Sequence, residues 1–112
     1  MQYEKYFGGS VALHWSHFHQ INGYPNRMWG WGGEDDELYK RVTTKGIKIK
    51  YLDQKIGRFK CLDHDPTETN EHRWQQLRHS LEFMSKDGLN SLNYSVNKII
   101  YQSHYTHVFA NI

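Results

Sequence analysis

The segment 29–37, WGWGGEDDE, constrains the fold of this chain more than any other, because it joins a glycine-rich loop directly to four acidic residues. Leu38 and Val42 follow at helical spacing, and basic residues gather toward the end of the run. Acidic residues at the start and basic residues at the end complement the dipole of an α-helix. The sequence therefore predicts a helix over 34–45, ended by Gly46 and entered through a loop with two tryptophans.

The same segment has the chemistry of a sugar site. Glycines let the backbone approach a ligand, indole faces stack on apolar rings such as the C–H faces of sugars, and carboxylates accept hydrogen bonds from hydroxyls. One of the acids could also act as a general base for a hydroxyl. The alternative is that the acids only complement the helix dipole, at ~0.3–1 kcal/mol each, while the tryptophans fill the core. The residues alone favour neither interpretation.

Composition restricts the class of protein. With 112 residues, 14 Lys and Arg against 12 Asp and Glu, and no basic block, the chain has room for one modest core and shows no signal for nucleic-acid binding. No apolar run approaches the ~18–20 residues of a membrane span, and the N-terminus lacks the pattern of a signal peptide. The sequence thus predicts a single domain over 1–112 without a membrane segment.

The rest of the chain alternates helical and strand-like segments. Ser16 is placed to cap a short helix over 17–22, and the apolar spacing of 71–86 predicts a longer amphipathic helix. Strand patterns cover 6–15, 47–52, 56–62 and one or two segments within 98–112. We therefore expect an α/β (α+β-like) fold, with a mixed sheet and two or three helices.

A second cluster, at 61–65, brings a thiol, an imidazole and two carboxylates together. Cys61 and His64 could contribute to a metal site, although further ligands would have to come from elsewhere in the chain. The alternative is that His64 is an ordinary surface residue of a polar loop. Cys61 is the only cysteine, which excludes a disulfide within the chain.

Four strings carry a family resemblance. They are YFGG at 6–9, INGYPN at 21–26, WGWGGEDDE at 29–37 and DGLNSL at 87–92. In this order and spacing they closely resemble the C-terminal half of the β-1,4-galactosyltransferases. The resemblance implies the C-terminal half of a GT-A type fold that supplies the acceptor site and the catalytic base. The upstream half, which carries the family's D-x-D-type nucleotide site, has no counterpart in these residues, so we expect poor UDP-galactose binding and slow turnover by this chain alone.

The resemblance also implies an activity. It is the inverting, metal-dependent transfer of galactose from UDP-galactose to the 4-hydroxyl of a terminal N-acetylglucosamine, in the Golgi lumen. By position, Asp35 corresponds to the catalytic base and Glu34 to an acceptor-binding residue. The resemblance further assigns Arg73, Trp74 and Leu77 to the acceptor acetamide, and Tyr6, Trp31, Gly32 and Gly33 to the donor side. Alternatives are a sugar-binding module without catalysis and an inactive truncated paralogue.

The metal assignment departs from the family pattern. His64 matches the family's metal-binding histidine, but Cys61 stands where the vertebrate enzymes have a methionine ligand. A thiolate is a softer ligand, so we expect Mn²⁺ or another divalent metal such as Zn²⁺ or Co²⁺. The His-Asp-Pro string at 64–66 is also similar to the branch that galactosylates xylose, a further alternative for the acceptor.

Overall fold

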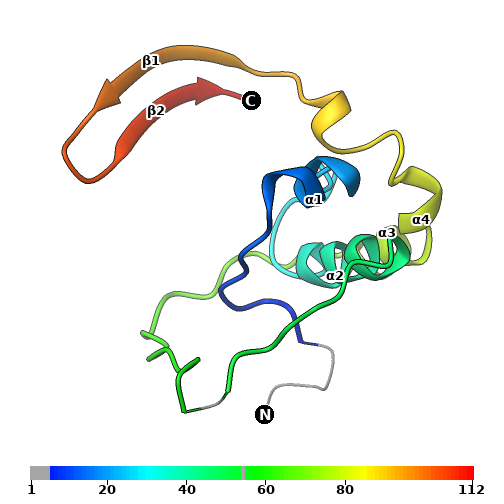
Figure 1. Cartoon of the computed structure of the whole chain (residues 1–112). Coiled ribbons are helices and arrows are strands. Elements are labelled where there is room, and N and C mark those ends of the chain that lie inside the picture. The colour runs from blue at the N-terminus through cyan, green and yellow to red at the C-terminus, as the bar shows by residue number, and fades with distance from the viewer. Residues whose placement is uncertain (1–5, 54) are drawn as a thin grey trace.

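The computed structural model describes residues 6–53 and 55–112, and its helices form one body from which a β-hairpin reaches away (Figure 1). The α/β class expected from the sequence is confirmed. The elements in chain order are α1 (Trp15–Gln20), α2 (Glu34–Thr44), α3 (Arg73–Arg78), α4 (Ser80–Phe83), the 3-10 helix η1 (Leu89–Ser91), β1 (Ser95–Tyr101) and β2 (Thr106–Asn111). Within the described ranges, no helix has the length and apolar character needed to cross a membrane.

All three predicted helical regions are helical, with different boundaries. Helix α2 begins and ends within one residue of the prediction. Helix α1 is capped by His14 rather than by Ser16, because the His14 ring nitrogen accepts from the Ser16 backbone N–H at 3.3 Å. The helix predicted over 71–86 is divided at His79 into α3 and α4.

The strand predictions hold only at the C-terminus. Strands β1 and β2 pair antiparallel, so the described residues contain a two-stranded hairpin instead of the expected mixed sheet. The segments 6–15, 47–52 and 56–62 form no strand among the described residues. Alternating apolar and polar residues favour an extended backbone, but a strand also needs a partner for its N–H and C=O groups. Among the described residues, no strand pairs with these three segments.

A small apolar core lies on one side of α2. Phe7, Ile21, Leu38 and Val42 are buried together, and the Phe7 ring meets the Tyr39 ring edge-on at 5.8 Å between centroids. Other partly buried side chains complete this cluster: Leu13, Phe18, Ile47 and Ile49. The core therefore fixes α2 against the segments on either side of it.

A polar lock, formed by the turn 22–26 and the segment 87–91, holds the face of α2 next to this core. Arg41 is fully buried and donates to Glu37 Oε1 at 2.7 Å, to the Gly23 carbonyl at 3.1 Å and to the Asp87 carbonyl at 2.8 Å. Asn22 donates to Asn90 Oδ1 at 2.7 Å, linking the two segments directly. Two of the motifs that carry the family resemblance thus face one another, and α2 is attached to both.

Candidate functional site

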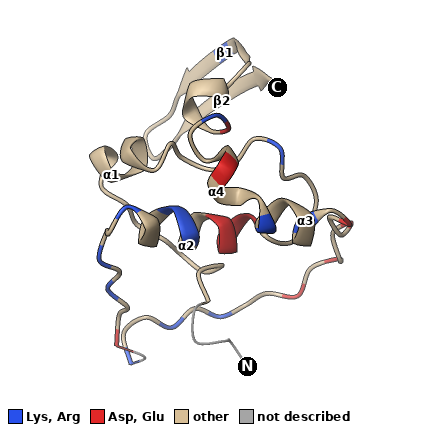
Figure 2. Cartoon of the chain, turned by 90° about the vertical axis from the view of Figure 1, so that its right-hand side faces the viewer, with Lys and Arg blue, Asp and Glu red and all other residues tan. Residues whose placement is uncertain are grey.

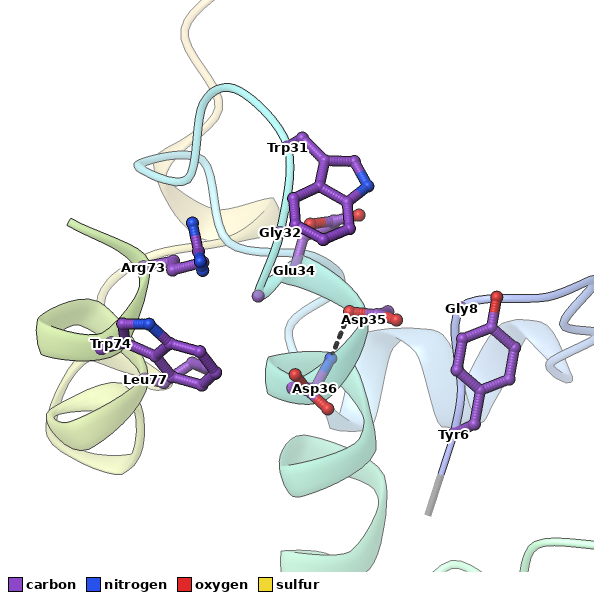
Figure 3. Close-up of a pocket in the computed structure, with 11 residues that line it drawn as sticks. Tyr6, Gly8, Trp31, Gly32, Glu34, Asp35, Asp36, Arg73, Trp74 and Leu77 are labelled. Atoms are coloured by element: carbon purple, nitrogen blue, oxygen red, sulfur yellow. Dashed lines mark hydrogen bonds between the residues drawn. The ribbon is translucent and has the colours of Figure 1, made fainter. Parts of the chain in front are cut away.

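A pocket of about 310 Å³ lies at the N-terminal end of α2 (Figure 3). This volume suits a small ligand such as a monosaccharide. The lining residues come from three parts of the chain: Tyr6 and Gly8; Trp31, Gly32, Gly33, Glu34, Asp35 and Asp36; and Arg73, Trp74 and Leu77. Nine of these eleven residues are the donor-side and acceptor-side residues expected from the sequence. The fold therefore brings together segments that are up to seventy residues apart in the chain.

The carboxylates of the pocket stand on the first turn of α2. Asp35 Oδ1 accepts a hydrogen bond from the Asp36 backbone N–H at 2.9 Å, which fixes that carboxylate (Figure 3). Glu34 is exposed, whereas Asp35 and Asp36 are half-buried. The positive end of the helix dipole attracts negative charge at this place. An ionised carboxylate that faces a pocket can accept a hydroxyl proton.

The loop before α2 presents Trp31 to the pocket. Its backbone pairs with the segment before α3: the Trp31 N–H donates to the Glu68 carbonyl at 2.7 Å, and the Asn70 N–H donates to the Trp31 carbonyl at 3.0 Å. The indole is 60% exposed, and that of Trp29 is 67% exposed. The interpretation that these tryptophans fill the core is therefore wrong. They are available for contact with a ligand.

Two glycines let this loop pack closely on α3. Gly32 and Gly33 have φ angles of 106° and 101°, a region that side-chain-bearing residues rarely adopt. A Cβ on Gly33 would lie 2.6 Å from Met28 Cε and 3.3 Å from Arg73 Cβ. The positive φ therefore favours glycine here, and the close approach of Arg73 Cβ shows that the loop is pressed against the opposite wall.

Helix α3 forms that opposite wall. The Arg73 guanidinium lies 5.7 Å from the centroid of the Trp31 ring and 5.1 Å from that of Trp74, so a cation stands between two indoles. Lys40 on α2 donates to the Leu77 carbonyl at 2.6 Å, which ties the C-terminal end of α3 to α2. Trp74 is 65% exposed, although the amphipathic pattern predicted it on the buried face. It lines the pocket instead.

The structure adds residues that the sequence did not indicate. Gly8 lies in the YFGG motif at 6–9, of which the sequence assigns only Tyr6 to the site, and Asp36 lies within a run of four acids. Asn70 holds the loop from outside the pocket: its side chain accepts from the His72 N–H at 3.0 Å and donates to Gln76 at 2.8 Å. An asparagine shortly before a helix is a recognisable signal for such a turn.

The two expected metal ligands lie away from the pocket lining. Cys61 and His64 are both exposed. The Cys61 thiol lies 3.8 Å from the Leu62 carbonyl oxygen, and His64 Nδ1 lies 2.9 Å from the Asp65 carbonyl oxygen. Among residues 6–53 and 55–112, no three His, Cys, Asp or Glu side chains are grouped to hold a metal ion. An imidazole and a thiol alone do not make a closed site.

The known sequences to which this chain is similar are galactosyltransferases. A family model described as the N-terminal domain of galactosyltransferase matches residues 1–65. The chain is 37% identical over its whole length to β-1,4-galactosyltransferase 2 of Cricetulus griseus, of which it covers 31%. It is 38% identical to β-1,4-galactosyltransferase 1 of Bos taurus, of which it covers 29%. The chain therefore spans about a third of the length of these curated relatives.

A solved structure is similar over nearly the whole chain. The catalytic domain of Drosophila β1,4-galactosyltransferase 7, in complex with xylobiose, superposes with a TM-score of 0.58 at 25% sequence identity. The match covers 97% of this chain and 49% of that domain. The arrangement described above thus corresponds to about half of a galactosyltransferase catalytic domain.

Proposed function

This chain belongs to the β-1,4-galactosyltransferase family, and from that premise we propose that it supplies the acceptor site and catalytic base for galactosyl transfer. The donor in this proposal is UDP-galactose, and the acceptor is the 4-hydroxyl of a terminal N-acetylglucosamine. We place the chain in the C-terminal half of the catalytic domain because of its motifs, although the matched family model is described as an N-terminal domain. The proposed location of the complete protein is the Golgi lumen.

One observation carries the proposal: the pocket unites a half-buried carboxylate, two exposed indoles and an arginine at one helix end. Indoles offer apolar faces to a sugar ring, and carboxylates accept bonds from its hydroxyls. Three carboxylates and one guanidinium line the pocket, so it suits a neutral, hydroxyl-rich ligand better than an anion.

The mechanism follows from where these side chains stand. Asp35, fixed through its Oδ1, would accept the proton of the acceptor hydroxyl through its other oxygen as that hydroxyl attacks the sugar donor. The bond between the anomeric carbon of galactose and the UDP oxygen breaks as the new bond forms on the opposite face, so UDP leaves and the configuration is inverted. Trp31 and Trp74 would hold the sugar rings and exclude water, and Glu34 would accept from a further hydroxyl.

We also propose a divalent metal, Mn²⁺ or a softer ion, with Cys61 and His64 as two of its ligands. Their donor types suit Zn²⁺ or Co²⁺ as well as Mn²⁺. The described residues do not group a third donor with them, so the remaining ligands would have to come from elsewhere.

Xylose is a second candidate acceptor, because the similar solved structure is a complex with xylobiose. The His-Asp-Pro string at 64–66 also favours a xylose acceptor. Calorimetric titration of the chain with N-acetylglucosamine and, separately, with xylose compares the two candidates. A third titration with UDP-galactose, with and without Mn²⁺, tests the donor and the metal. Binding of N-acetylglucosamine or xylose without binding of UDP-galactose would support a chain that supplies only the acceptor part of the site. If neither N-acetylglucosamine nor xylose binds, the proposal is contradicted.

The role of Asp35 is tested by Asp35→Asn in a preparation that transfers galactose. A general base contributes about 10²- to 10⁴-fold, so turnover should fall by that order. The affinity for the acceptor should fall much less, because the amide keeps the shape of the side chain.

Glu71→Gln is the matched control, since Glu71 is an exposed acid outside the pocket lining. It should leave both turnover and affinity unchanged. If Asp35→Asn reduces affinity and turnover equally, Asp35 binds the acceptor and is not the base.

A further inference from the structure

The backbone at Gly8 lies directly against the carboxylate of Asp35. An ideal Cβ placed on Gly8 would overlap Asp35 Oδ2, and it would stand 3.0 Å and 3.1 Å from Cε2 and Cζ of the Tyr6 ring. The side chains of Asp35 and Tyr6 therefore already occupy the space that an alanine methyl group at position 8 would need. Figure 3 shows Asp35 on the side of α2 that faces the segment carrying Tyr6 and Gly8.

The other oxygen of this carboxylate is also held. Asp35 Oδ1 accepts from the Asp36 N–H at 2.9 Å. An Oδ2 pushed away from residue 8 moves by rotation of the Asp35 side chain, and that rotation also displaces Oδ1 from its bond with the Asp36 N–H. Both oxygens are therefore placed by contacts on opposite sides.

Gly8 is required for space and not for backbone conformation. It is absent from the glycines with positive φ, whereas Gly32 and Gly33 are among them. Alanine can adopt the backbone conformation at position 8, so Gly8→Ala changes the contact with Asp35 and Tyr6 without straining the chain.

We propose that Gly8 is a positioning residue: its lack of a side chain sets where Asp35 Oδ2 stands relative to the Tyr6 ring. The functional part of this inference rests on the proposed role of Asp35 as the base. A Cβ at position 8 would displace Oδ2 by on the order of 1 Å before van der Waals contact is restored. A misplacement of that size can cost about 10²-fold in rate.

The test compares Gly8→Ala with Gly9→Ala in the ligand-free chain. Gly9 is the matched control, because it is the next residue and a Cβ there would meet only Tyr6 Cε1, at an ordinary contact distance of 3.8 Å. The readouts are the NMR signals of the Asp36 amide and of the Asp35 side-chain carboxyl carbon. Both should shift in Gly8→Ala and stay close to the wild-type values in Gly9→Ala. Equal shifts in the two variants, or none in either, would overturn the proposal.

Stability gives a second readout that remains usable if Gly8→Ala folds poorly. Asp35→Ala in the Gly8→Ala chain removes the carboxylate that the new Cβ meets, so it should raise the melting temperature back toward that of Asp35→Ala alone. A double variant that stays as unstable as Gly8→Ala would show that the clash lies elsewhere and would overturn the proposal.

Turnover then separates this inference from the proposed function. In a preparation that transfers galactose, Gly8→Ala should lower kcat by about 10- to 100-fold, with a smaller change in the KM for the acceptor. Gly9→Ala should keep the wild-type kcat. If Asp35→Asn keeps full turnover while the NMR shifts of Gly8→Ala are present, the positioning contact stands and the role of Asp35 as base falls. Shifts in Gly8→Ala without a loss of kcat, where Asp35→Asn does abolish turnover, would overturn the positioning role.

Discussion

Tyr24 links the turn before the tryptophan loop to the acids of the pocket. Burial raises the pKa of its hydroxyl above the ordinary value of 10.0, and the negative charges of Glu34 and Asp35 raise it further. Each effect disfavours the phenolate, since burial removes water from the anion and the carboxylates repel it. The neutral phenol is thus favoured by folding. Its contribution to stability is fully present below pH 10.0 and declines as the pH rises through the raised pKa.

This coupling predicts that Asp35→Asn lowers the pKa of Tyr24. The substitution removes one of the two negative charges, whereas burial and Glu34 remain, so the pKa should move down but stay above its ordinary value. NMR titration of the tyrosine ring carbons measures it, with Tyr24→Phe identifying the signal among the eight tyrosines. Asp63→Asn serves as the control, because Asp63 is not among the groups that raise this pKa. An equal response to both variants would mean that Tyr24 does not sense the pocket acids.

Helix α2 depends on buried charges as much as on its apolar face. Acidic and basic stretches both lie on α2 (Figure 2). Glu37 and Arg41 are fully buried one turn apart, and Arg27 lies within 3.8 Å of the second Glu37 oxygen. The Arg41 guanidinium satisfies carbonyls on both motif segments, so removing it would leave a buried carboxylate and several acceptors without their partner.

We therefore expect Arg41→Met to destabilise the chain by about 3–5 kcal/mol, the usual cost of breaking a buried ion pair. Lys48→Met, at an exposed position, should stay within about 0.5 kcal/mol of wild type. Urea unfolding measures the free energy of unfolding of both variants, and the comparison holds when their m-values equal that of the wild type. Adding Glu37→Leu to Arg41→Met should recover part of the loss, because it removes the unpaired charge. A loss in Arg41→Met no larger than in the control would mean that the lock contributes little.

The elements that sequence predicts well are those whose signals are local. Helix α2 carries its acidic start, its apolar spacing and its glycine stop within fifteen residues, so its boundaries follow from the sequence. The segment 47–52 alternates apolar and charged residues, and 56–62 was its expected neighbour, but a strand exists only beside another strand. Local pattern cannot specify that partner. The division of the third helix at His79 has no breaker residue to announce it, and we have no physical account of it.

At the scale of the whole molecule, the pocket is a product of tertiary structure. Family resemblance predicted nine of its lining residues, but no spacing rule places Tyr6, Asp35 and Arg73 around one volume. The backbone bridge from Trp31 to the segment 68–70 and the bond from Lys40 to Leu77 bring the walls together. Neither contact has a sequence signal, because each joins residues that are more than thirty positions apart.

The β-hairpin is stabilised by its own strand pairing and by little else. Of the residues in β1 and β2, only Ile100 is partly buried, and the rest are exposed along their whole length. An isolated two-stranded hairpin is marginally stable in water. Its backbone hydrogen bonds should therefore open far more often than those of α2, whose Leu38 and Val42 are buried in the core.

Native-state hydrogen exchange, followed by NMR, checks this difference. The amides of β1 and β2 should exchange at rates near those of an unfolded chain, and the amides around Leu38 to Val42 should be the slowest. The internal reference is the Asp36 amide, which is bonded to Asp35 at the exposed start of α2 and should lie between the two groups. If the hairpin amides are as protected as those of α2, the exposed strands are covered in solution. Dilution then distinguishes two explanations. If a second copy of the chain covers the hairpin, the protection of its amides falls as the protein is diluted; if the hairpin packs within one molecule, the protection does not change.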